Sequence, residues 1–524
     1  MGQLCLRRQS GARRLCAAFS VCLALSVGPA IATTYTVTNL SDSGSGSLRD
    51  AIDQANRNTG ADIIAFQAGL TGAITLGIGV GQIDIFDPLT INGPGPGRIS
   101  ISGNNVSRIF NIYPPAGSAD VFTVAINGLK FTAGNSTDEG GAILVGDSNL
   151  SLQNCEFRNN SALRGGGVYA FPVEGSTTLT VRDSLFDSNS ASADGGAFGA
   201  QDIDNVIVSG VVASNNSAVR NGGAAFLRAG NTTITTSRFE TNHAATSPPG
   251  VGGPSGGGAI RLDGSKPTAI MSVSEVRFTG NTSAFGWGGA LSMTVGAANL
   301  DRMQLNANTA NTLGGALSAY AIAMTMSNSS FGGNSANQAG GAIAFDTSGS
   351  MAMTNITLSG NSSNASNGGG IYSGSNTTLS VTSSTIVGNS ANGSGGGVKR
   401  EGINASLLST IVANNTAATG PDLSGNFLPN SSLIKNTSGA TLTAGNGNLS
   451  TGLDPLLGPL AVNGGPTLTL LPTATSPVLN AGDPSASGLP PTDQRGLARI
   501  SGGRVDIGAV ERQTPEDVIF RGVF

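Results

Sequence analysis

This sequence contains little charge and few aromatic side chains for its length. Only 11% of its 524 residues are charged and 5% are aromatic, with one histidine and one tryptophan. An ordinary globular domain has about 25% charged residues. The formal net charge at pH 7 is −4, so the chain lacks the basic surface that binds nucleic acid or anionic lipid.

Cysteine is scarce too, with four residues in the whole chain. Three of them, Cys5, Cys16 and Cys22, lie in the first 32 residues, and Cys155 is the fourth. If the first segment is removed, no pair of cysteines remains to form an internal disulfide.

The first 32 residues have the pattern of a signal peptide. Four arginines at positions 7, 8, 13 and 14 precede an apolar run from Leu15 to Val27, and Ala30-Ile31-Ala32 forms a small-residue cleavage site. An apolar run of about thirteen residues is too short to span a bilayer as a helix. We therefore predict a signal peptide over 1–32 and an extracellular or cell-surface location, with no integral membrane segment after cleavage.

Glycine is abundant, with 78 residues, and much of it lies in an internal repeat. A Gly-Gly pair followed by a small or apolar residue starts at Gly140, Gly166, Gly195, Gly222, Gly257, Gly288, Gly314, Gly340, Gly369 and Gly396. An apolar residue followed three positions later by asparagine recurs in phase, ending at Asn160, Asn189, Asn242, Asn281, Asn308, Asn334, Asn361, Asn389 and Asn415. A weaker copy ends at Asn216, because Ala213 takes the apolar position.

A repeat of about 27 residues with short alternating apolar runs indicates a parallel β-helix. We expect three strands per repeat and about fifteen coils, which would form a rod about 70 Å long. The apolar column would fill the lumen, and the asparagines would form an amide ladder at a bend, where asparagine tolerates left-handed backbone angles. The glycine pair would allow a tight or left-handed turn. The predicted fold class is all-β, a right-handed parallel β-helix.

The two ends of the repeat region have different patterns. Residues 33–130 contain an amphipathic segment in which Leu48, Ala51, Ile52 and Ala55 share one face, preceded by a capping box of Ser47 and Asp50. This predicts a helix that plugs the open end of the solenoid, followed by the first coils. At the other end, 421–511 would form the last coils and a β-rich cap, and 512–524 a short tail.

The repeats over 131–420 resemble those of polymorphic outer-membrane proteins. That resemblance implies a surface-exposed β-helix associated with adhesion, a family in which an outer-membrane β-barrel normally follows. About a hundred residues follow position 420, too few for the long series of strands in such a barrel.

Residues 453–511 resemble the choice-of-anchor Q domain of bacterial surface and secreted proteins. The segments "TDQRG" at 492–496 and "VDIGAVE" at 505–511 carry this resemblance. Asp493, Arg495 and Asp506 within them suggest either catalysis or metal binding, or a buried ion pair that closes the last coil. We favour the buried pair.

Enzymatic β-helices need a column of carboxylates on one face. Alignment of the coils places Arg158 beside Asp187 and Asp138 beside Arg164, which predicts surface ion pairs. The densest acidic group falls at different coil positions, and consists of Asp183, Asp187, Asp194, Asp202 and Asp204. We therefore expect solvated turns in preference to a catalytic or calcium site.

Other binding candidates are His243, a few aromatics and one insertion. His243 follows a ladder asparagine, so we interpret it as a surface turn residue and not as a catalytic base. Trp287, Tyr169 and Tyr372 lie close to glycine pairs and either stack on sugars or pack against neighbouring coils. The long interval between Asn242 and Gly257 makes Ser247–Ser255 a candidate ligand-facing loop, with neutral variation in loop length as the alternative.

These observations favour a secreted β-helical scaffold that recognises an extracellular polysaccharide or surface protein without catalysis. A polysaccharide lyase or glycoside hydrolase, and a purely structural matrix element, remain alternatives. No catalytic residue, cofactor or metal ligand is predicted.

Overall fold

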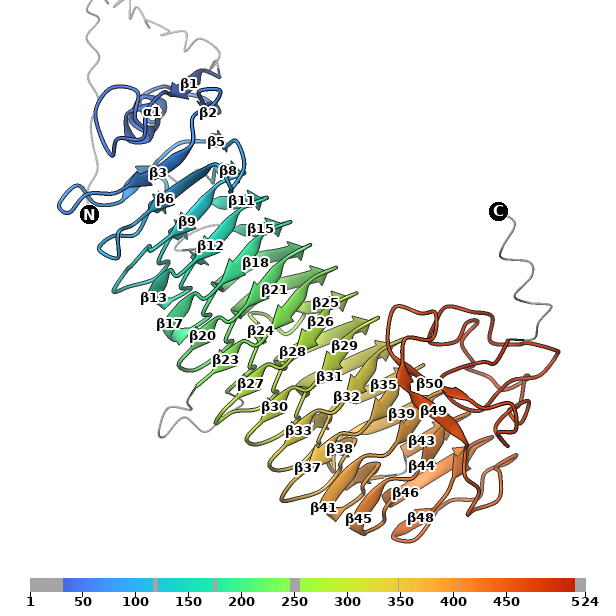
Figure 1. Cartoon of the computed structure of the whole chain (residues 1–524). Coiled ribbons are helices and arrows are strands. Elements are labelled where there is room, and N and C mark those ends of the chain that lie inside the picture. Colours follow the sequence, from blue (N-terminus) through green and yellow to red (C-terminus); the bar gives the residue numbers. More distant parts are fainter. Residues whose placement is uncertain are drawn as a thin grey trace, which may run out of the picture.

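The computed structural model describes residues 32–115, 121–172, 177–245, 255–346, 348–403 and 405–513. Over these residues the chain forms a right-handed parallel β-helix, a rod of stacked coils (Figure 1). The predicted fold class is confirmed. Residues 1–31 of the predicted signal peptide, the insertion at 246–254 and the tail at 514–524 lie outside the described residues.

A single coil shows how the sequence turns the chain. Strand β31 (Leu317–Ser327) belongs to the first sheet, sheet A, β32 (Ser330–Gly332) to sheet B and β33 (Ser335–Ala336) to sheet C. A left-handed residue follows each sheet, namely Asn328 (φ 51°), Gly333 (φ 62°) and Gly340 (φ 74°). Asparagine and glycine adopt this conformation more easily than other residues, so they mark the corners.

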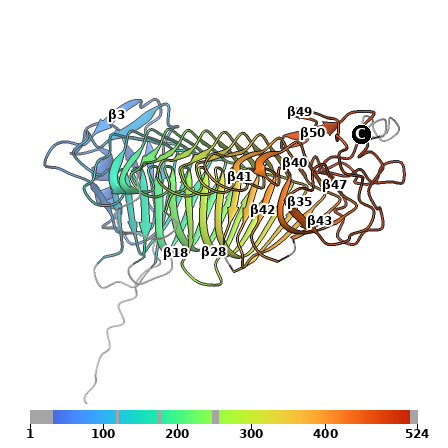
Figure 2. The same ribbon diagram turned by 90° about the horizontal axis from the view of Figure 1, so that it is seen from below.

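The three sheets extend along the rod with 24, 14 and 10 strands (Figures 1 and 2). The 14 strands of sheet B correspond to 14 coils, close to the expected number. Each coil contributes two strand segments to sheet A. In one coil they are separate strands, β34 (Ile343–Phe345) and β35 (Ser350–Thr354), and in the coil before it they are joined in the single strand β31. The prediction of three strands missed the strand of sheet C, which is often only two residues long and leaves no alternating pattern.

The predicted asparagine ladder is confirmed. In its middle, Asn308 Oδ1 accepts hydrogen bonds from the main-chain N and the Nδ2 of Asn281, both 3.0 Å long. Asn308 Nδ2 donates to Asn334 Oδ1 (3.0 Å) and to the carbonyl of Phe278 (3.1 Å). The expectation of left-handed angles at these asparagines is wrong, because the preceding residue, such as Ala307 (φ 53°), adopts them. The ladder asparagine is instead positioned by its side-chain bonds.

Aromatic side chains fill the lumen as predicted. Phe131, Phe157 and Phe186 are buried on consecutive coils, and their ring centroids are 4.8 and 4.7 Å apart. Ala213 follows Phe186 in register, as the weaker repeat copy implies, and the ring of Phe198 packs 5.1 Å from that of Phe186. Stacking of this kind adds stability beyond the burial of apolar area.

The glycine pairs make the third corner, with one correction. In most coils the left-handed residue is the first glycine of the predicted pair. In three coils it is the glycine one position earlier, and these residues are Gly165, Gly368 and Gly395. In those coils three glycines occur in a row, and the third takes the small-residue position. A Cβ on the second glycine has no room, since at Gly141 it would lie 2.2 Å from the carbonyl oxygen of Gly166.

The predicted capping helix is α1 (Leu48–Ala55). Its four predicted apolar residues are buried, and Ser47 Oγ accepts a hydrogen bond from Asp50 N (3.1 Å). The Asp50 carboxylate accepts from Gly46 N (3.0 Å) and not from Ser47 N, so the reciprocal bond of the capping box is displaced by one residue. The helix contacts β1 (Thr34–Val37), β2 (Asp62–Phe66) and β4 (Ile83–Ile85) at the start of the rod.

The C-terminal segment does not lie where it was expected. Residues 453–513, with the antiparallel strands β49 (Leu457–Ala461) and β50 (Thr469–Pro472), fold back along the flank of the rod over sheet B (Figure 1). Thr357 Oγ1 donates to Gln494 Oε1 (2.6 Å), and Ala509 N donates to Thr385 Oγ1 (3.0 Å). Apolar side chains complete the contact between Ile411, Leu433, Val478 and Ile507.

Candidate functional site

Most of the acidic residues singled out from the sequence are engaged in ion pairs. Asp187 pairs with Arg158 (2.5 Å), as predicted, and the other pairs are Asp194 with Arg220 (2.6 Å), Asp202 with Arg228 (2.9 Å) and Asp204 with Lys266 (3.2 Å). Asp183 occupies a left-handed corner (φ 47°). Within the described ranges, no three His, Cys, Asp or Glu side chains gather closely enough to hold a metal ion.

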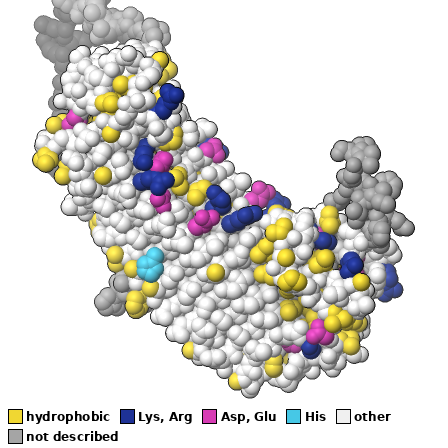
Figure 3. Space-filling model, in the orientation of Figure 1, with side chains coloured by type: hydrophobic (Ala, Val, Ile, Leu, Met, Phe, Trp, Pro, Cys, Tyr) yellow, Lys and Arg dark blue, Asp and Glu magenta, His cyan; other side chains and the backbone are white. Residues whose placement is uncertain are grey.

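One predicted ion pair is wrong by a single residue. Arg164 Nη1 lies 2.9 Å from the Oε1 of Glu139, not against Asp138. The register shifts between Ala162 and Arg164, so simple counting along the coil fails there. Charged side chains of both signs lie along the rod in the view of Figure 3.

His243 lies in a short strand and not in a turn. Strand β23 (His243–Ala244) places it between Ser217 and Thr282 of the neighbouring coils, and its side chain is half-buried. The predicted ligand loop follows it directly, but residues 247–254 of that loop lie outside the described part of the chain.

The C-terminal polar residues form a buried network. Asp493 is fully buried and pairs with Arg495 (2.8 Å), as expected for an ion pair in preference to a catalytic group. Asp506 accepts hydrogen bonds from Asn480 N (2.6 Å) and Arg512 N (2.7 Å) and does not join that pair. The network closes residues 453–513, which we call the flank segment, and not the last coil. Burial, together with the nearby Asp506 carboxylate, raises the pKa of Glu511 to about 8.

The outer face of sheet A carries the strongest candidate site. Alternation along each strand turns every second side chain outward, which places the half-buried Tyr320 on β31 and Tyr372 on β38 (Ile371–Ser373) on this face. Trp287, at the corner before β28 (Leu291–Asp301), stacks on Tyr320 with ring centroids 5.2 Å apart and planes 20° from parallel. We call Trp287, Tyr320 and Tyr372 the aromatic strip.

Charged groups lie along the aromatic strip. Asp346 follows β34, which pairs with β31 on one side and β38 on the other, so its carboxylate lies between the coils of the two tyrosines. Partial burial and then the Asp346 carboxylate raise the pKa of Tyr320, and partial burial, Asp346 and Glu401 raise that of Tyr372. The Glu401 carboxylate lies 3.5 Å from Lys399 Nζ.

The floor of the aromatic strip is rigid at its N-terminal side. Arg261 is only 5% exposed, and it donates to Ser292 Oγ (2.7 Å) and Thr294 Oγ1 (2.8 Å) on the next coil. The same guanidinium pairs with Asp263 (2.6 Å). From the coil of Trp287 to that of Glu401, the site covers four coil steps, about 19 Å along the rod.

Trp287 and Tyr372 were predicted candidates, and the structure brings both into one site. Tyr169, the third, belongs elsewhere, because its ring is buried and its hydroxyl donates to Gln201 Oε1 (2.8 Å). Tyr320 and Asp346 were missed although a signal existed. Each lies six residues after a left-handed glycine, Gly314 or Gly340, so an alignment on those glycines would have placed them side by side.

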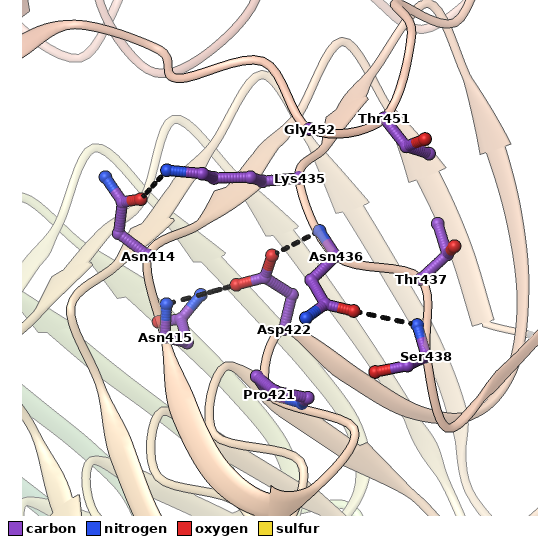
Figure 4. Close-up of a pocket in the computed structure, with 10 residues that line it drawn as sticks. All are labelled: Asn414, Asn415, Pro421, Asp422, Lys435, Asn436, Thr437, Ser438, Thr451 and Gly452. Atoms are coloured by element: carbon purple, nitrogen blue, oxygen red, sulfur yellow. Dashed lines mark hydrogen bonds between the residues drawn. The ribbon is translucent and has the colours of Figure 1, made fainter.

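A second hollow lies where the asparagine ladder ends. This polar pocket of about 670 Å³ includes Asp422, whose Oδ1 accepts from Asn415 N and Nδ2 and whose Oδ2 accepts from Asn436 N (Figure 4). Burial raises the pKa of Asp422. Lys435 Nζ reaches across the pocket to Asn414 Oδ1 (2.6 Å). Its polar side chains are mostly bonded to one another, and it lacks the aromatic surface of the strip.

No protein-family model and no curated protein matches this chain. A solved structure of a mannuronic acid specific polysaccharide family 6 lyase enzyme from human gut microbiota aligns with 80% of this chain and 92% of its own. The identity is 10% and the TM-score is 0.39. No helix among the described residues is both long and apolar enough to cross a membrane.

Proposed function

We propose that this protein is a secreted or cell-surface recognition protein that binds an extracellular polysaccharide along the aromatic strip without cleaving it. The observation that carries the proposal is the group formed by Tyr320 and Tyr372 on the outer face of sheet A and by Trp287 at the corner beside them. The predicted signal peptide and the resemblance of the repeats to surface-exposed β-helices support the location outside the cell.

Aromatic rings in this setting suit a sugar polymer. Tyrosine and tryptophan combine an apolar ring with a polar edge, and they are enriched where proteins bind partners. In the part of the chain that the structure describes, the hydroxyl groups of Tyr320 and Tyr372 form no hydrogen bond, so both can bond to a ligand. An extended site on a straight rod matches an extended polymer better than a compact ligand.

The test is a polysaccharide array scored for binding and for cleavage, followed by titration calorimetry on each hit. Trp287→Ala and Tyr320→Ala should each weaken binding about 30-fold, the loss typical of a hot-spot aromatic. Tyr113→Ala is the matched control, since Tyr113 is 37% exposed and follows β7 (Phe110–Ile112) of the same sheet outside the strip. Binding that survives both strip variants would overturn the proposal.

The cleavage readout addresses the enzymatic alternative. Release of reducing ends or unsaturated products from a bound polysaccharide would replace recognition with hydrolysis or lyase chemistry. Because Asp346 and Glu401 lie on the same face, Asp346→Asn and Glu401→Gln would then be the first variants to assay for lost turnover.

A further inference from the structure

We infer that the polymer bound by the aromatic strip is a cationic amino sugar, whose free ammonium group pairs with Asp346. This inference rests on the proposed function and names its ligand class. It starts from an unusual carboxylate. Among the described residues, Asp346 forms no hydrogen bond and no ion pair, although its side chain is half-buried.

Other carboxylates in the neighbourhood are compensated. Asp263 pairs with Arg261, and Glu401 pairs with Lys399. Among the described residues, Asp346 is therefore the carboxylate of the strip that has no salt-bridge partner, and the nearby buried guanidinium of Arg400 donates instead to the carbonyl of Gly374. A partly buried carboxylate without a partner loses hydration with no compensation, and a bound ammonium would restore a charge-assisted hydrogen bond.

The two tyrosines strengthen the preference for a cation. Tyr320 and Tyr372 lie on either side of the Asp346 coil, about 10 Å apart along the rod. Aromatic faces attract ammonium groups through their negative π surfaces, and the attraction grows when the cation is partly desolvated. A sugar with an ammonium substituent would place its ring against the tyrosines and its charge against the carboxylate.

The backbone leaves room for this arrangement. Gly374 is the neighbour of Asp346 on the next coil, and a Cβ at Gly374 would lie 1.9 Å from Asp346 Oδ1. The carboxylate therefore rests directly over a residue without a side chain. Gly374→Ala should displace the carboxylate while leaving the charge of the site unchanged.

The experiment titrates the full-length protein with a glucosamine oligomer, its N-acetylated counterpart and a neutral glucan of equal length. We expect the glucosamine oligomer to bind at least tenfold more tightly than the other two, and added salt to weaken its binding. Asp346→Asn should remove that tenfold preference, and Gly374→Ala should reduce it. The control Asp53→Asn removes an exposed carboxylate of α1 and should leave the preference intact.

Each outcome decides one of the two claims. Equal affinity for all three oligomers, or a preference that survives Asp346→Asn, overturns the ammonium inference and leaves polysaccharide binding in place. No binding of any polysaccharide overturns the proposed function itself. Asp346→Asn is expected to fold normally, because the carboxylate has no partner within the described chain to lose, and thermal unfolding of the variant checks this.

Discussion

Each ladder asparagine serves as donor and acceptor at once, and this explains why the ladder ends in an acid. Every Asn Nδ2 needs an acceptor on the next coil, so a final asparagine would leave an N–H without a partner. Asp422 takes that place, and its two oxygens only accept. The last rung thus satisfies Asn415 and Asn436 and requires no further acceptor.

Removing one interior rung should loosen its neighbours. Asn308→Ala leaves the main-chain N–H and one side-chain N–H of Asn281 without an acceptor and the Phe278 carbonyl without its side-chain donor. Each buried polar group left unpaired costs about 1–3 kcal/mol. We expect amide hydrogen exchange at Asn281 to accelerate at least tenfold. Asn311→Ala, an exposed asparagine on the same coil, should leave that rate unchanged.

At the scale of elements, the capping helix is needed because a solenoid exposes core at its ends. Ile52 is fully buried and belongs to the same apolar cluster as the lumen residues. Ile52→Ala should destabilise the first coils by about 2–5 kcal/mol, with faster hydrogen exchange in β1 and β2. Gln54→Ala, on the exposed side of α1, is the control. Unchanged protection of both strands in Ile52→Ala would show that the helix does not hold the end of the rod.

The repeating elements were predictable and the placement of the flank segment was not. The glycine pairs and the ladder asparagines recur at a regular spacing, so these two columns of residues predict the fold. The contact between Thr357 and Gln494 joins positions 137 apart and follows no repeat. The sequence contains one indication that sheet B is covered. The outward residues change from the charged Arg238 and Arg277 to the small Ser330 and Thr357, but this column can be recognised only after the strand register is known.

Only part of the candidate site could be predicted, because contacts between coils do not show in the sequence. Trp287 and Tyr372 were visible as rare residue types beside glycine pairs. Asp346 looks like an ordinary turn residue in the sequence, and its importance comes from what surrounds it. Only the stacking of coils shows that two tyrosines flank it and that no described residue forms an ion pair with it.

For the whole molecule, the flank segment ties the end of the chain to coils formed more than a hundred residues earlier. Its interior holds charged groups at very low exposure, including Arg499 at 1% and Glu511 at 1%. Arg499 donates to Asn355 Oδ1 on the rod (2.5 Å) and to the Gly508 carbonyl (2.9 Å). Attachment of the segment therefore depends on the ionisation of its buried acids.

Attachment should weaken as the pH rises through 8. The pKa of Glu511 is raised from 4.5 to about 8, first by burial, and burial also raises that of Asp506. The folded state therefore binds protons more tightly than the unfolded state, and this stabilisation is fully present below about pH 4.5 and lost as Glu511 ionises. We expect protease cleavage within 453–513 to accelerate between about pH 5 and pH 8. Glu511→Gln should reduce that acceleration, with Asp506 carrying the remainder, whereas Glu240→Gln on the rod should retain it. Equal acceleration in Glu511→Gln would place the pH dependence on another group.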